Sequence, residues 1–135
     1  MKIFSILILS ISFCLFSSCK KDAGVGGKAS ISGKIWYQEW NSNFTTLQLE
    51  REGYDEYVYI QYGEEISYGD RIKTSYDGRF EFNYLRPGKY KVYCYSKDPS
   101  DKDNVNPDAM MVVLEEIEIL EKEQKIELDT MVVLN

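Results

Sequence analysis

The sequence of 135 residues contains no histidine. Histidine is the commonest general base near neutral pH and the commonest zinc ligand. The chain also lacks a Gly-x-Ser-x-Gly turn, a phosphate-binding glycine loop and a cluster of cysteines. We therefore predict no catalytic residue, no metal site and no cofactor, and we expect that the protein is not an enzyme.

Cysteine is also scarce, with three residues in the chain. Cys14 and Cys19 lie in the first 19 residues, so Cys94 is the one cysteine of the remaining sequence. A single cysteine cannot form an internal disulfide, and the stability of the domain must come from a hydrophobic core. Cys94 alternates in phase with apolar neighbours, which predicts a buried and unreactive thiol.

The first residues have the layout of an export signal. Lys2 precedes an apolar run over residues 3–16, which is shorter than the roughly 20 residues that span a membrane. The run ends in Phe16-Ser17-Ser18-Cys19, which resembles a lipobox. We predict a lipoprotein signal peptide at 1–18 and palmitate-type acylation of Cys19. The alternatives are an ordinary signal peptide and an anchor that stays uncleaved.

The charge of the chain is acidic, with a net value of −6 at pH 7. Nucleic acids and anionic membranes bind clusters of Lys and Arg, so we expect no nucleic-acid partner. Membrane attachment must then come from the acyl chains on Cys19. Residues 19–28 are charged and rich in glycine, which predicts a flexible tether. The predicted location is the cell envelope, at the outer membrane of a Gram-negative bacterium, with the membrane face undetermined.

From Ala29 onward, apolar and polar residues alternate with a period of two. The apolar members of these runs are Ile31, Ile35, Val58, Ile60, Phe80, Phe82, Tyr90, Val92, Ile117, Ile119, Ile126 and Leu128. This alternation, rich in β-branched and aromatic residues, is typical of half-buried antiparallel strands. We predict an all-β fold, a single antiparallel seven-stranded β-sandwich, over residues 29–135.

Two turn sequences punctuate the strands. Asp77-Gly78 lies between two strand patterns and predicts a hairpin, because glycine tolerates a positive φ. Arg86-Pro87-Gly88-Lys89 fits a type II turn, with proline and glycine at its two central positions. Phe80, Phe82 and Leu85, with Tyr90 and Val92, would then share one apolar hairpin face and belong to the core.

The run from Tyr76 to Val92 resembles the central signature of carboxypeptidase regulatory-like domains, which belong with transthyretin-like and Cna-B-type domains. It contains an Asp-Gly turn, Phe-x-Phe, and Leu-x-Pro-Gly-x-Tyr-x-Val in the order of that signature. The resemblance spans residues 29–135 and implies a prealbumin-like or immunoglobulin-like sandwich. It does not imply an activity, because function belongs to a site and not to a fold.

Exposed aromatic residues are the candidate binding site. On the outward phase of the predicted strands, or near them, are Trp36, Trp40, Tyr57, Tyr59, Tyr93 and Tyr95. Such side chains contact proteins and stack on sugar rings. The alternative is that the tyrosines only form cross-strand pairs that stabilise the sheet.

Two connecting segments are longer than a minimal β-sandwich needs. Residues 39–55 separate the first two clear strands, and Leu47 and Leu49 could add a short strand there. Residues 97–109 are rich in Asp and Asn, so either a calcium-binding loop or a solvated loop is possible, and the EF-hand spacing is absent. The predicted function is a lipid-anchored, non-catalytic binding or scaffolding module with a protein partner. The alternatives are a carbohydrate-binding lipoprotein with a Tyr/Trp face and a structural stalk.

Overall fold

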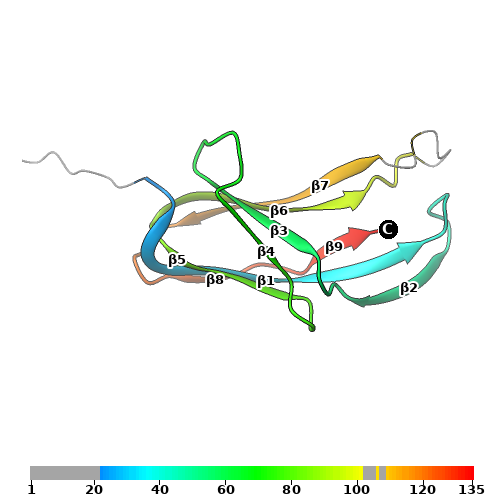
Figure 1. Cartoon of the computed structure of the whole chain (residues 1–135), viewed down its shortest axis with the longest axis horizontal. Helices are drawn as coiled ribbons and strands as arrows, with labels where there is room; N and C mark the ends of the chain where they lie inside the picture. Colours follow the sequence, from blue (N-terminus) through cyan, green and yellow to red (C-terminus); the bar gives the residue numbers. More distant parts are fainter. Residues whose placement is uncertain (1–21, 102–105, 107–108) are drawn as a thin grey trace, which may run out of the picture.

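The computed structural model of the chain describes residues 22–101, 106 and 109–135. The predicted signal peptide at 1–18 and the lipidation site Cys19 lie outside these residues. The described residues form nine strands and no helix (Figure 1): β1 (Val25–Trp40), β2 (Leu47–Glu52), β3 (Tyr57–Tyr62), β4 (Asp70–Lys73), β5 (Arg79–Leu85), β6 (Gly88–Lys97), β7 (Met110–Ile119), β8 (Lys125–Glu127) and β9 (Met131–Leu134). In this part of the chain, no helix could cross a membrane.

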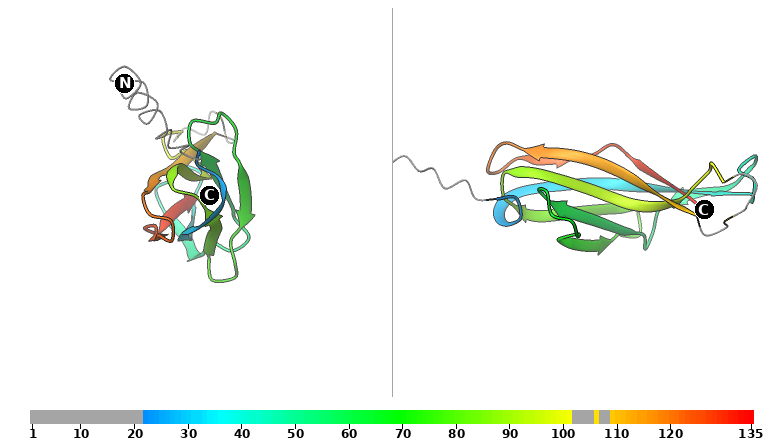
Figure 2. Two further views of the ribbon diagram at one scale, coloured as in Figure 1. Left: turned by 90° about the vertical axis from the view of Figure 1, so that its left-hand side faces the viewer. Right: turned by 90° about the horizontal axis from the view of Figure 1, so that it is seen from above.

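The strands form two sheets that face each other across a common core (Figures 1 and 2). One sheet has four strands in the order β4-β3-β6-β7. The other has five strands arranged around β1, which is 16 residues long. The first half of β1 pairs with β5 and β8, and its second half pairs with β2 and β9. The prediction of an all-β, two-sheet fold is confirmed.

Two details of that prediction are wrong. The described residues contain nine strands rather than seven, because β2 and β4 fold back as short hairpin partners of β1 and β3. The fold is also not wholly antiparallel, because β8 and β9 run parallel to β1. The chain crosses from β7 to the other sheet at residues 120–124 and then returns alongside β1, which sets this direction.

The Asp77-Gly78 turn forms, but the predicted type II turn at Arg86-Pro87-Gly88-Lys89 does not, because Gly88 has a φ of 151° and already belongs to β6. Neither of the predicted hairpins forms. At Asp77-Gly78 the N–H of Ser75 donates to the carbonyl of Arg79 at 2.8 Å, and Gly78 has a φ of 75°. The Asp77-Gly78 turn joins β4 of one sheet to β5 of the other, and a bend at Pro87 returns the chain to β6. The apolar sets of β5 and β6 therefore face each other across the core rather than lying side by side.

The predicted core residues are confirmed. Phe80, Phe82, Leu85, Tyr90 and Val92 are all at most 4% exposed. Other residues of the same core are fully buried, such as Ile31 and Ile35 on β1 and Val58 and Ile60 on β3. Gly33 leaves room for this packing, since a Cβ atom there would lie 2.5 Å from the ring of Phe80. Any larger residue at position 33 would have to displace that ring.

The tether prediction is wrong for residues 25–28, which already belong to β1. Immediately before them, the N–H of Gly24 donates to the Tyr90 hydroxyl, and the Arg86 side chain donates to the carbonyl of Asp22. A Cβ on Gly27 would lie 2.0 Å from the carbonyl oxygen of Leu85. Gly27 therefore serves the close approach of two backbones, which composition alone cannot distinguish from flexibility.

Candidate functional site

The structure divides the six candidate aromatic residues between the two sheets. Tyr57 and Tyr59 on β3, with Tyr93 and Tyr95 on β6, lie on the outer surface of the four-stranded sheet. Their neighbours in sequence, such as Val58 and Val92, point inward and are fully buried. Trp36 and Trp40 lie on β1, in the opposite sheet. The prediction of one shared Tyr/Trp face is therefore wrong, because strand phase does not reveal which sheet a strand joins.

Strand register arranges the tyrosines in rows across the sheet. One row runs across all four strands, with Arg71 opposite Tyr59, Tyr59 opposite Tyr93, and Tyr93 opposite Leu114. Beside it, Tyr57 is opposite Lys73 and Tyr95 is opposite Val112. Residues directly opposite in antiparallel strands share a face and touch. The tyrosines thus lie between cations on β4 and aliphatic residues on β7.

Tyr59 is the centre of this cluster. Its ring stacks on that of Tyr93, with centroids 5.2 Å apart and planes inclined by 11°. The rings of Tyr95 and Tyr68 lie in T-shaped contact with it, with centroids 5.5 and 5.3 Å away, and the ring of Tyr57 lies 6.3 Å away. Tyr68 lies in the β3–β4 connection, outside any alternating run, so the sequence did not reveal it. We call these five residues the tyrosine face.

Two cations from β4 cover Tyr57. The guanidinium of Arg71 and the ammonium of Lys73 each lie 4.8 Å from the centre of its ring. Lys73 is also ion-paired with Asp55 at 2.8 Å, whereas Arg71 forms no ion pair within the described part of the chain. A side-chain hydrogen bond with Tyr59 raises the pKa of Arg71. Arg71 is therefore a fully charged donor beside the rings.

A large part of this surface is open to solvent. Tyr57, Tyr68 and Tyr95 are 42%, 47% and 46% exposed. Leu114 and Val112 on β7 continue the surface and are 45% and 49% exposed. A continuous exposed patch of aromatic and aliphatic side chains is uncommon on a monomer and is typical of interaction sites.

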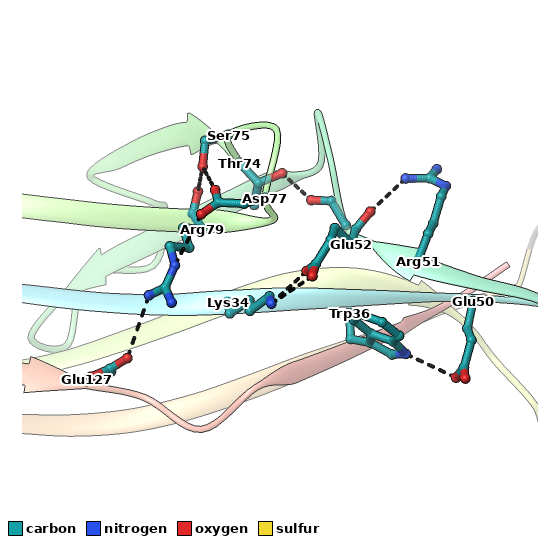
Figure 3. A network of polar contacts seen from close by, with 11 residues as sticks. Lys34, Trp36, Glu50, Arg51, Glu52, Thr74, Ser75, Asp77, Arg79 and Glu127 are labelled. Carbon is teal, nitrogen blue, oxygen red and sulfur yellow. Dashed lines mark hydrogen bonds and ion pairs between the residues drawn. The ribbon is translucent and has the colours of Figure 1, made fainter.

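The outer surface of the five-stranded sheet has a different chemistry (Figure 3). The indole N–H of Trp36 donates to Glu50 at 3.2 Å, and Lys34 is ion-paired with Glu52 at 2.7 Å. Further along the sheet, Arg79 contacts Asp77 at 3.2 Å and Glu127 at 3.8 Å. This surface is covered by charged pairs, and Trp36 is one member of the network rather than part of an open aromatic platform.

Thr74 ties the two sheets together beside this network (Figure 3). Its side chain is 4% exposed, and its hydroxyl donates to the carbonyl of Gly53. The same hydroxyl accepts the N–H of Glu56 at 2.9 Å. The sequence did not single out Thr74, because a threonine at a strand end looks like an ordinary polar turn residue.

Described residues of the two long segments meet at one end of the sandwich. Trp40, Phe44, Lys97 and Asp98 contribute to a cavity of ≈170 Å³ there. Hydrogen bonds from the side chain of Ser100 and from its N–H, the latter at 2.8 Å, lower the pKa of the Asp98 carboxyl group. Within residues 22–101, 106 and 109–135, no group of three His, Cys, Asp or Glu is placed to hold a metal ion. Residues 102–105 and 107–108 of the candidate calcium loop lie outside the described residues.

Cys94 is 1% exposed, as the alternation predicted. Burial raises the pKa of its thiol to about 12, and the charge of Glu56 adds to this effect. A buried thiol that stays protonated near neutrality is a poor nucleophile.

No family model matches the chain, and no curated protein sequence matches it. Among solved structures, it is similar to a proposed carbohydrate-binding protein from Pseudomonas aeruginosa, with a TM-score of 0.45 and 14% identity. That match covers 79% of this chain and 91% of the other. At this level the likeness says nothing about the ligand of the present chain.

Proposed function

We propose that this protein is a non-catalytic docking module of the cell envelope, and that the tyrosine face binds another protein. The observation that carries the proposal is the open surface formed by five tyrosines with Val112 and Leu114 beside them.

The orientation of the rings favours a protein over a sugar. A sugar ring stacks on the free face of an aromatic ring. Here one face of Tyr59 is covered by Tyr93, and Tyr57 lies under Arg71 and Lys73. Parts of Tyr68 and Tyr95 remain accessible together with the aliphatic side chains of β7, and such a surface suits the mixed apolar and polar surface of a protein.

The charges around the face indicate what the partner carries. Of the two cations that lie against Tyr57, Lys73 is ion-paired with Asp55 and Arg71 has no ion pair within the described residues. Lys91 farther along β6 is already placed near Glu116, at 3.8 Å. A partner with a carboxylate beside apolar side chains would pair with Arg71 and cover the tyrosines. Tyrosine and arginine are also the residues that most often dominate binding energy at protein interfaces.

The anchor is part of the same proposal. Acylated Cys19 would lie three residues before Asp22, close to the end of the sandwich where β1 begins. The domain itself we propose to be of the carboxypeptidase regulatory-like type. This assignment is supported by the two-sheet fold and by the burial of Phe80, Phe82, Leu85, Tyr90 and Val92. The outer membrane remains the proposed location.

Photo-crosslinking in intact cells tests the docking surface. The full chain would carry p-benzoylphenylalanine in place of Tyr95, or in place of Trp36 as the matched control on the other sheet. We expect a discrete protein adduct from position 95 and none from position 36. The adduct should disappear with Arg71→Glu or Tyr59→Ala, and the linked partner peptide should contain Asp or Glu. Equal adducts from both positions would count against the proposal.

A glycan array with the same protein tests the alternative. Binding that is lost in Tyr59→Ala and Tyr95→Ala, together with no protein adduct at position 95, would replace the protein partner by a carbohydrate. The anchor is tested separately by Cys19→Ser, which should move the chain from the membrane to the soluble fraction. If that variant stays in the membrane, the lipid-anchor proposal is wrong, and the docking proposal is unaffected.

A further inference from the structure

Strand β7 forms an open edge of the four-stranded sheet. Among the described strands it pairs with β6 only, in an unbroken register from Met110 to Ile119. Its first five residues, Met110 to Leu114, are all apolar, and four of them are 37–54% exposed. An unpaired, uncharged and apolar strand edge is a template for another strand.

The other edge strands of the described part carry the features that prevent such pairing. β4, at the opposite edge of the same sheet, has four residues and includes Asp70, Arg71 and Lys73. In the five-stranded sheet, β2, β5 and β8 all carry charged side chains. β9 is uncharged, but it is short, and the N–H of Leu134 is bonded to the hydroxyl of Ser96 at 2.9 Å. The first half of β7 has neither charge, proline nor bulge.

We propose that this edge pairs with the same edge of a second copy of the chain, antiparallel and centred on Val112. In that register Met110 lies opposite Leu114, and Met111 lies opposite Val113. The apolar half of each strand then meets the apolar half of its partner. This proposal is independent of the docking function of the tyrosine face.

Charge selects this arrangement among the possible ones. The second half of β7 carries Glu115, Glu116 and Glu118. A parallel pairing in register would place each glutamate beside its own copy, and like charges directly opposite destabilise a sheet. An antiparallel pairing centred on Leu114 would place Glu116 against the partner's Val112. Centring on Val112 instead sets residues 110–114 of one copy against residues 110–114 of the other, so that no glutamate lies opposite the apolar segment.

The pairing would also join two tyrosine faces. Val112 and Leu114 lie on the same surface as Tyr95 and Tyr93, which are their partners in register. Two four-stranded sheets would become one sheet of eight strands, with both clusters on one side. An envelope protein of this kind would present two docking surfaces related by a two-fold axis.

Cysteine crosslinking of the full chain in its membrane tests the proposed axis. In Val112→Cys the two thiols would face each other across the antiparallel pair, with Cα atoms about 4.5–5.5 Å apart, within the range that a disulfide spans. Val132→Cys on β9 is the control, since Val132 is similarly exposed on the other sheet. After mild oxidation, we expect several-fold more linked dimer from Val112→Cys than from Val132→Cys. Equal yields would overturn the proposal.

A second pair of variants fixes the register. Met110→Cys/Leu114→Cys cannot close within one chain, because four strand residues span about 13 Å. It should form linked dimers, and adding Val112→Lys should abolish them, because two ammonium groups would meet on the axis. If the double variant links equally well with Lys at position 112, the pairing is not centred there and the proposal fails. The unchanged protease resistance of each variant serves as the control for folding.

Discussion

The phenol oxygen of Tyr90 accepts a hydrogen bond of 2.9 Å from the backbone N–H of Gly24, a residue 66 positions earlier in the chain. The same hydroxyl donates to the carbonyl of Arg86 at 2.6 Å. The side chain is 1% exposed. Tyr90 therefore joins the start of β1, the β5–β6 turn and the core at one end of the sandwich.

Tyr90→Phe should lower the free energy of unfolding by about 1–3 kcal/mol, because the N–H of Gly24 would be left buried without an acceptor. Urea denaturation followed by tyrosine or tryptophan fluorescence measures the change. The control is Tyr76→Phe, which should change the free energy of unfolding little because Tyr76 is 86% exposed. A change no larger than that of the control would mean that water replaces the hydroxyl.

Thr74→Val keeps the size of a buried side chain but removes its hydroxyl. The N–H of Glu56 loses its acceptor and the carbonyl of Gly53 loses its donor. We expect a loss of about 1–3 kcal/mol in the free energy of unfolding. Thr74→Ser keeps the hydroxyl and should retain most of the stability; two variants of equal stability would show that the hydroxyl contributes nothing.

The stacked pair Tyr59–Tyr93 should couple in a double-mutant cycle. Aromatic pairs contribute about 0.5–1.5 kcal/mol beyond their buried area. Tyr59→Ala and Tyr93→Ala together should therefore destabilise the protein by less than the sum of the two single changes. Tyr59→Ala with Tyr76→Ala is the control pair, which should be additive. Additivity at Tyr59–Tyr93 would contradict the stacking.

Because the thiol of Cys94 is buried, we expect the free energy of unfolding to fall in alkali. The folded thiol has a pKa of about 12, above its ordinary value of 9.0, so between these values the unfolded chain releases a proton that the folded chain retains. The contribution of Cys94 is complete below pH 9 and is lost as the pH rises toward 12, by at most about 1.4 kcal/mol per pH unit. Denaturant unfolding at a series of pH values measures this slope.

The matched comparison for Cys94 is Cys94→Ala. Other groups that ionise in alkali, such as Tyr90, titrate in both proteins, so the difference between their slopes isolates the thiol. The variant should be less stable at pH 8 because of the smaller side chain, but its stability should fall less steeply above pH 9. Parallel curves would show that the thiol is not held neutral by the fold.

Much of the fold follows from the alternation of side chains. Val58 and Ile60 point inward, and Tyr57 and Tyr59 outward, because successive residues of a strand must face opposite sides. Cys94 could be assigned to the core for the same reason. This rule gives the face of each residue relative to its own strand, and the prediction at that level is accurate.

The pairing of strands could not be derived in this way. Phe82 and Tyr90 are separated by a short turn, which is compatible either with a hairpin or with a step between two sheets. Trp36 and Tyr59 both point outward, yet they lie on opposite sides of the molecule. Which sheet a strand joins depends on the burial of the whole core, so it cannot be predicted from a local sequence pattern. Tyr68 was missed because it lies outside any strand.

The position of β1 has a mechanical consequence. This strand begins close to the end of the chain that would be attached to the membrane, and it is bonded along both edges, to β5 and β2 on one side and to β8 and β9 on the other. A pull on the N-terminus, parallel to the strand, loads these hydrogen bonds together in shear instead of breaking them one by one. Tension between the membrane anchor and a bound partner would therefore act first on β1, the strand that is hydrogen-bonded along both edges.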